Sequence, residues 1–108
     1  MRFRDKVAVI TGAGQGIGEA YALALAEQGA GVVIAEIDKL AGQRVANTLI
    51  KDGHDALFVE TDIASVESCH ALAEAVTERF GGVDFLVNNA AIFAGKRKDG
   101  LLTVDWAY

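Results

Sequence analysis

A glycine-rich stretch near the amino terminus limits what this chain can fold into. Four glycines recur between positions 12 and 18, directly after the apolar run Val7–Ile10 and directly before an alanine- and leucine-rich segment. Glycine lacks a Cβ, so it lets the backbone turn sharply and lets a ligand approach the peptide groups. The first N–H groups of a helix and the positive end of its dipole attract anions. The sequence therefore predicts a strand, a bare turn and a helix whose first turn binds an anion such as a phosphate.

Apolar periodicity predicts that strands and helices alternate along the chain. Runs that are apolar on both faces indicate strands buried in a parallel sheet, and apolar residues that recur every three or four positions indicate helices. The predicted strands are residues 6–11, 32–35, 56–60 and 84–87, and the predicted helices are 17–28, 39–51 and 66–80. Such alternation with short loops is typical of right-handed βαβ units. The predicted fold class is therefore α/β, with a doubly wound parallel sheet.

Each predicted helix is amphipathic, with its apolar residues on one stripe. In the first helix the stripe consists of Ile17, Ala20, Tyr21, Ala24 and Leu25. In the second helix it consists of Ala41, Val45, Thr48 and Leu49. Ser65 is the predicted N-cap of the third helix, because its hydroxyl suits the free N–H groups of a first turn.

The last residues do not complete a fold of this class. After Ala91 the sequence becomes polar and contains glycines, and residues 101–108 begin a further helical pattern. A sheet of four strands would also leave its apolar fourth strand at an open edge, with unpaired backbone groups. We therefore expect the 108 residues to be one domain and to form the amino-terminal half of a longer protein.

Composition and charge exclude several classes of partner. The formal net charge of −5 argues against a general binder of nucleic acid or of anionic membranes, because either needs a basic surface. The basic triplet 96–98 is interpreted as part of a solvated loop. The single cysteine, Cys69, suits a reducing compartment, and the first apolar run is too short for a signal peptide or a membrane span. We therefore predict a cytoplasmic protein with no nucleic-acid or membrane partner.

Acidic residues close the second predicted strand. Glu36 follows Gly16 by twenty residues, and ligands of doubly wound sheets lie beyond the carboxyl ends of the strands. A carboxylate at this place accepts hydrogen bonds from the hydroxyls of an adenosine ribose and repels a 2′-phosphate. Neither position 15 nor position 37 holds a lysine or arginine that would bind that phosphate. The sequence thus favours NAD over NADP, with Asp38 as a residue that could share the role or take it over.

Polar residues follow the third and fourth predicted strands as well. Asp62 could reach the edge of an adenine ring while Ile63 packs on it, although an aspartate before a helix is by itself more often a cap. Asn88 and Asn89 end the fourth strand, and buried amides need hydrogen-bond partners. We therefore expect the two asparagines to fasten this strand to its neighbours, and the small residues at 90 and 91 to leave room for a ligand.

Together these motifs resemble the short-chain dehydrogenase/reductase family. The similarity rests on T-G-x-x-x-G-I-G after the first strand, an acidic residue closing the second, Asp-Ile after the third and V-D-F-L-V-N-N-A after the fourth. It implies a Rossmann-like fold and an NAD(P)-dependent oxidoreductase that interconverts an alcohol and a ketone by hydride transfer. It also implies a dimer or tetramer in the complete protein, of which residues 1–108 would be the cofactor-binding part.

The resemblance further implies roles for individual residues. The pyrophosphate would be held by Gly12, Gln15, Gly16, Ile17 and Gly18. The adenosine ribose would be held by Glu36 with Ile37, and the adenine by Asp62 with Ile63. The ribose side of the cofactor would be lined by Asn89, Ala90 and Ala91, although the family usually has glycine at the last position. The family's proton-transfer groups, a serine followed by Tyr-x-x-x-Lys, fall beyond residue 108, so no catalytic residue and no metal ligand is predicted in this stretch.

Two other interpretations stay open from the sequence. A methyltransferase also places a G-x-G-x-G turn after its first strand, and residues 12–16 fit that spacing. The acidic residue usual just before those glycines is missing here, however, and Asn88-Asn89-Ala90 is foreign to that class. A non-catalytic dinucleotide-binding module, complete as it stands, is the second alternative. The identity of the substrate is not readable from these residues.

Overall fold

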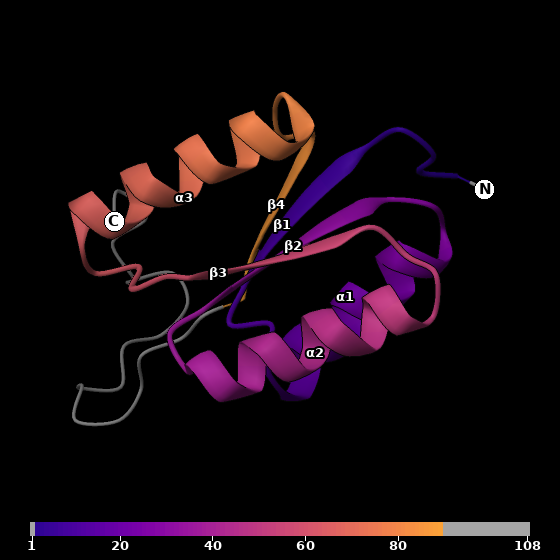
Figure 1. The fold of residues 1–108 in the computed structure, drawn as a ribbon, viewed down its shortest axis with the longest axis horizontal. Coiled ribbons are helices and arrows are strands. Elements are labelled where there is room, and N and C mark those ends of the chain that lie inside the picture. The colour runs from indigo at the N-terminus through magenta and orange to yellow at the C-terminus, as the bar shows by residue number, and fades with distance from the viewer. Residues whose placement is uncertain (1, 90–108) are drawn as a thin grey trace, which may run out of the picture.

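The computed structural model describes residues 2–89, in which strands and helices alternate strictly (Figure 1). The strands are β1 (Val7–Thr11), β2 (Gly31–Glu36), β3 (Ala56–Glu60) and β4 (Phe85–Asn88). The helices are α1 (Gly16–Glu27), α2 (Lys39–Lys51) and α3 (Val66–Phe80). All seven predicted elements are confirmed, with ends that shift by at most one residue. The helical pattern at 101–108 lies outside the described residues. None of the described helices is long and apolar enough to cross a membrane.

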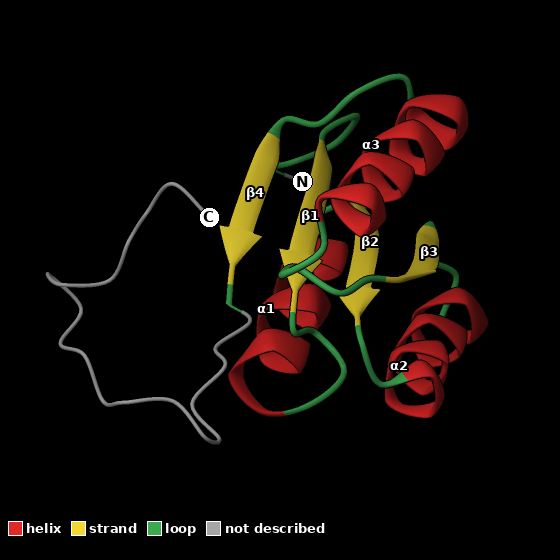
Figure 2. Cartoon of the chain, turned by 90° about the vertical axis from the view of Figure 1, so that its left-hand side faces the viewer, coloured by secondary structure: helices red, strands yellow, loops and turns green. Residues whose placement is uncertain are grey.

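All four strands run parallel in one sheet with the order β3-β2-β1-β4 (Figure 2). β1 pairs on one side with β2, where Val9 lies opposite Val33, and on the other side with β4, where Val9 lies opposite Leu86. The chain thus winds outward from β1 to β3 and then returns to the opposite side of β1. In doubly wound sheets, the crevice at such a reversal is where ligands bind.

Helices cover both faces of this sheet, with α1 and α2 on one face and α3 on the other (Figures 1 and 2). Alternate strand residues point to opposite sides, as the period of a strand requires. Ile10 and Ile34 belong to the apolar cluster beneath α1 and α2, whereas Val9 and Val33 belong to the cluster beneath α3. This double coverage explains why the central strands are apolar on both faces.

The apolar stripe predicted for α1 is wrong as a guide to the buried face. Ile17 is 67% exposed and Tyr21 is 47% exposed, and of the whole stripe only Leu25 is partly buried. The residues that α1 buries are Gly18, Ala22 and Ala26. These small residues let the helix approach the sheet closely. Because α1 is rich in alanine and leucine all round, its sequence pattern does not single out one face.

The stripe predicted for α2 is right in part. Val45 and Leu49 are buried as predicted, together with Gly42 and Ala46. Thr48 is exposed, however, and its hydroxyl donates to the carbonyl oxygen of Arg44 at 3.0 Å. The Thr48 hydroxyl thus finds its hydrogen-bond acceptor one turn earlier in the same helix, and the side chain can lie on the exposed face of α2.

Ser65 is the N-cap of α3, as predicted, because its Oγ accepts a hydrogen bond from the backbone N–H of Ser68 at 3.1 Å. We expect Ser65→Ala to lower the free energy of unfolding by about 1 kcal/mol, measured by urea denaturation. Ser65→Asp keeps an acceptor at the cap and should stay within about 0.5 kcal/mol of the wild-type protein. An equal loss in the two variants would contradict the capping role.

Candidate cofactor-binding site

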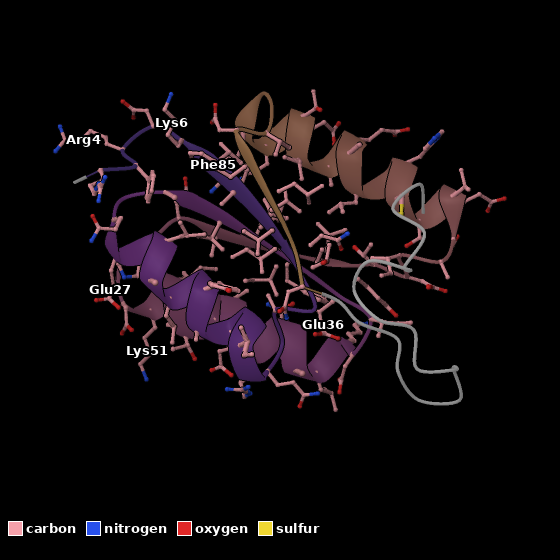
Figure 3. All side chains as sticks on the ribbon, turned by 180° about the vertical axis from the view of Figure 1, so that it is seen from behind. Arg4, Lys6, Glu27, Glu36, Lys51 and Phe85 are labelled. Carbon is pink, nitrogen blue, oxygen red and sulfur yellow. The ribbon has the colours of Figure 1, made fainter. Side chains whose placement is uncertain are left out.

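The segments that the sequence marks as a site meet at the carboxyl ends of the strands. The glycine turn, residues 12–15, follows β1, Glu36 ends β2, Asp62 follows β3 and Asn89 follows β4. Because the strands are parallel, these ends lie on the same side of the sheet (Figure 2). Figure 3 shows Glu36 at the end of the sheet opposite to Lys6. The described residues of the predicted site therefore lie along one edge of the fold, whereas Ala90 and Ala91 lie outside the described residues.

The glycine turn connects β1 to α1 through backbone conformations that suit glycine. Gly12 and Gly16 have φ angles of 64° and 63°, in the left-handed region that side chains disfavour. The N–H of Gly12 donates to the Ala35 carbonyl at 2.8 Å, which ties the turn to β2. Gln15 is the N-cap of α1, and its side chain makes no capping hydrogen bond. The turn is thus held by its neighbours and not by a cap of its own.

The first turn of α1 has backbone donors open toward the site. Within residues 2–89, no carbonyl or side chain accepts a hydrogen bond from the N–H groups of Gly16, Ile17 and Gly18. Such free N–H groups, at the positive end of a helix dipole, form an arrangement that binds anions. The side chains of Gln15 and Ile17 are exposed beside them. The arrangement suits a phosphate group.

Gly18, in the first turn of α1, lies against the glycine turn and against Asn89, the residue after β4. A Cβ built on Gly18 would lie 2.3 Å from the Gly12 carbonyl oxygen and 2.6 Å from Nδ2 of Asn89. That same Nδ2 donates to the Gly12 carbonyl at 3.3 Å. Position 18 therefore has no room for a side chain, and a bare residue there lets α1 begin directly against the turn.

The two asparagines fasten the end of β4 to its neighbours, as predicted. The Thr11 hydroxyl, at the end of β1, donates to Oδ1 of Asn88 at 3.1 Å. Asn89 holds the glycine turn through its bond to Gly12. Thr11 is buried, so its hydroxyl needs such a partner inside the fold. These bonds join β1, the turn and β4 at the place where the winding of the sheet reverses.

Glu36 ends β2 with its carboxylate turned onto the glycine turn. The residue is only 8% exposed, its Oε1 accepts from the Gly14 N–H at 2.8 Å, and its Oε2 accepts from the Asp38 N–H at 3.0 Å. An ionised carboxylate has about four acceptor positions, so both oxygens keep capacity for a ligand hydroxyl. Asp38 serves as the N-cap of α2, where its Oδ1 accepts from the Ala41 N–H at 3.1 Å.

Asp62 is half-buried in the loop between β3 and α3. Its Oδ1 accepts from the Ala64 N–H at 2.9 Å, and its own N–H donates to Oγ of Ser68 at 2.8 Å. The carboxylate thus stabilises its loop, and Ile63 lies half-buried next to it. Among residues 2–89, no three or more His, Cys, Asp or Glu side chains gather in a way that could hold a metal ion.

Arg44 also belongs to this region, and no sequence motif marks it. From α2, its Nη2 donates to the Gly14 carbonyl oxygen at 3.0 Å and forms an ion pair with Oε1 of Glu19 at 3.1 Å. The hydrogen bond and the negative charge of Glu19 raise the pKa of the Arg44 guanidinium. Arg44 is 30 residues from Gly14 and 25 from Glu19, so a local pattern carries no signal of these contacts.

Comparison with known proteins relates this geometry to one family. A family model described as short chain dehydrogenase matches residues 6–107. An uncharacterized oxidoreductase of Mycobacterium tuberculosis is 47% identical over 106 residues, which are 98% of this chain and 43% of that protein. The solved structure of a short chain dehydrogenase/reductase from Burkholderia phymatum in complex with NAD matches with a TM-score of 0.77 at 42% identity, over 80% of this chain and 31% of that one.

A solved NAD+-bound xylitol dehydrogenase also matches, with a TM-score of 0.81 at 34% identity, over 85% of this chain and 35% of that one. The chain therefore spans less than half the length of each of these proteins, 43% in the case of the mycobacterial oxidoreductase. These similarities lend no support to a methyltransferase or to a non-catalytic module. They confirm the predicted Rossmann-like fold and the predicted resemblance, and this chain belongs to the short chain dehydrogenase family of oxidoreductases.

Proposed function

We propose that residues 1–108 form the NAD-binding part of a dehydrogenase that transfers a hydride between NAD and an alcohol or ketone. The observation that carries this proposal is the Glu36 carboxylate, which ends β2 and lies buried against the glycine turn. That position is where an acidic residue binds the adenosine ribose in dinucleotide-binding folds. Solved relatives in complex with NAD support the choice of cofactor.

Each part of the site has a counterpart in the dinucleotide. The open N–H groups at the start of α1 suit the pyrophosphate, which would be held by Gly12, Gln15, Gly16, Ile17 and Gly18. The adenosine ribose would be bound by Glu36 with Ile37, and the adenine by Asp62 with Ile63. The ribose side of the cofactor would be lined by Asn89, Ala90 and Ala91.

Charge is the reason to expect NAD in place of NADP. A 2′-phosphate on the ribose would come close to the Glu36 carboxylate, and like charges at such a distance repel strongly in a partly buried site. The nearest cation to the turn among the described residues is Arg44, and its guanidinium is already paired with Glu19. The site therefore offers a 2′-hydroxyl an acceptor, and the cation that contacts the glycine turn among the described residues is already paired.

The bound cofactor would supply the chemistry of hydride transfer, and the residues of this chain would bind and orient it. Residues 1–108 contain no Tyr-x-x-x-Lys pair for proton transfer. A small-molecule alcohol or ketone is the proposed substrate class, which the name of the related xylitol dehydrogenase supports. We also propose that the protein is cytoplasmic, since its single cysteine suits a reducing compartment. The resemblance to the family further suggests that the complete protein is a homo-oligomer.

Titration of the full-length protein with NAD and with NADP tests this proposal. Isothermal titration calorimetry should give a lower Kd for NAD. In Glu36→Gln the Kd for NAD should rise about tenfold, because a charge-assisted hydrogen bond to the ribose becomes a neutral one. The Kd for NADP should stay the same or fall, because the repulsion of the 2′-phosphate is removed.

Glu60→Gln is the matched control for this experiment. Glu60 lies opposite Glu36 in the register of β2 and β3, is exposed, and forms no hydrogen bond with the glycine turn. The Glu60→Gln substitution removes the same charge from the same end of the sheet but leaves the Glu36 carboxylate in place. It should therefore leave the ratio of the Kd for NAD to the Kd for NADP unchanged. Equal or tighter binding of NADP by the wild-type protein would contradict the proposed preference, as would an equal effect of the two substitutions.

A further inference from the structure

We propose that Arg44 is a positioning residue for cofactor selectivity, which holds the backbone of Gly14 so that Gly14 in turn holds the Glu36 carboxylate. The inference rests on the function proposed above. The backbone of Gly14 is bonded on both sides of its Cα: its N–H donates to Oε1 of Glu36 at 2.8 Å, and its carbonyl oxygen accepts from Nη2 of Arg44 at 3.0 Å. A single residue of the glycine turn therefore connects α2 to the end of β2 through its two adjoining peptide groups.

The contact between Gly14 and Glu36 is close enough to transmit a displacement. A Cβ built on Gly14 would lie 2.6 Å from Oε1 of Glu36 and 2.9 Å from its Cγ and Cδ. Gly14 is buried, and the carboxylate fills the space above its backbone. A shift of the Gly14 backbone must therefore move the carboxylate or break its hydrogen bond, and either change misplaces the acceptor for the ribose hydroxyls.

The glycine turn needs an outside support because it has little of its own. Gln15, the N-cap of α1, makes no side-chain capping bond, and glycine backbone is the least restricted of all residues. Arg44 supplies a charged donor to the Gly14 carbonyl from a neighbouring helix that is anchored in the core by Val45 and Leu49. The support is thus fixed to the rigid part of the fold.

Glu19 keeps Arg44 in this role. Its carboxylate accepts from Nη2 of Arg44 at 3.1 Å and from Nη1 at 3.4 Å, and it raises the pKa of the guanidinium, which stays charged. Both hydrogens of Nη2 then have acceptors, one on Glu19 and one on Gly14. This pairing favours a positioning role for Arg44 over binding of a 2′-phosphate. Loss of Arg44 should leave the Kd for NADP nearly unchanged in the first role and raise it in the second.

Arg44→Met in the full-length protein separates these roles. By calorimetric titration we expect the Kd for NAD to rise about fivefold, because this variant weakens binding by roughly the free energy of one hydrogen bond. The Kd for NADP should stay within about twofold of the wild-type value. The matched control is Lys51→Met, which removes the same charge from the far end of the same helix, away from Glu36 (Figure 3). The control should change neither constant by more than about twofold.

A second measurement on the same variants reports on the backbone of Gly14 without any cofactor. Hydrogen exchange of the Gly14 amide, followed by NMR, should be faster in Arg44→Met than in the wild-type protein by about fivefold and unchanged in Lys51→Met. Unchanged exchange in Arg44→Met, or an unchanged ratio of the two dissociation constants, would overturn the inference. A larger loss of NADP than of NAD binding would also overturn it, because Arg44 would then bind the phosphate. Failure of the proposed function would appear separately, as a wild-type protein without preference for NAD.

Discussion

The Gly18→Ala variant is expected to lose NAD binding and to unfold with a free energy about 3 kcal/mol below that of the wild-type protein. The added methyl group would lie 2.3 Å from the Gly12 carbonyl oxygen and 2.6 Å from Nδ2 of Asn89. The first of these atoms belongs to the backbone, so it cannot swing away as the end of a long side chain can. Either α1 moves away from the turn or the bond between Asn89 and Gly12 breaks. Urea denaturation gives the stability, and calorimetric titration with NAD gives the binding.

Gly82→Ala is the matched control for this substitution. A Cβ on Gly82 would meet no atom within 4 Å, and Gly82 is not among the glycines with a positive φ. The same chemical change should therefore alter the free energy of unfolding by less than about 0.5 kcal/mol and leave NAD binding intact. Wild-type stability and NAD affinity in Gly18→Ala would show that α1 and the end of β4 do not pack as closely as the structure has them.

Leu49→Ala is expected to lower the free energy of unfolding by about 4 kcal/mol. Leu49 is fully buried, with 0% exposure, in the cluster that joins α1 and α2 to the sheet. Truncation removes most of its apolar contacts and leaves a cavity between α2 and the strands, which the helix cannot close without losing its other contacts. Urea denaturation followed by circular dichroism measures the loss.

The adjacent residue provides the comparison for Leu49. Ile50 is 53% exposed on the outer side of α2, so Ile50→Ala should cost less than about 1 kcal/mol. The two substitutions remove side chains of similar size from successive positions of one helix, so their difference reports burial and not helix propensity. Similar losses in both variants would contradict the orientation of α2 on the sheet.

Local chemistry was enough to predict the strands and helices of this chain. The runs Val7–Thr11 and Ala56–Glu60 are rich in β-branched or aromatic residues, and helix α2 has an apolar period and an aspartate at its N-cap. These patterns involve residues that are close in sequence, so they can be recognised without knowledge of the fold. The face of α1 was predicted wrongly because alanine occurs on every side of it, and only contact with the sheet chooses among equivalent sides.

The site was predicted in outline by the same kind of signal combined with topology. Parallel strands end on one side of a sheet, so residues after four strands had to gather there. The two asparagines were expected to bond to neighbouring segments because buried amides need partners, and they do form such bonds, although Asn88 is exposed and Asn89 half-buried. The role of Arg44 had no such signal, since an arginine on an exposed helix surface looks the same whether or not it reaches another element.

The glycine stretch, by itself, determined that a strand is connected to a helix by a turn without large side chains. Glu36 determined what kind of ligand suits the end of the next strand. Only the tertiary structure decided how the two act together. Gly14 lies 22 residues from Glu36 and 30 from Arg44, and the three meet because β2 lies beside β1 and α2 folds back over the turn. Hydrogen bonds act over about 3 Å in space, whatever the separation along the chain, so the packing of the elements decides which donors and acceptors pair.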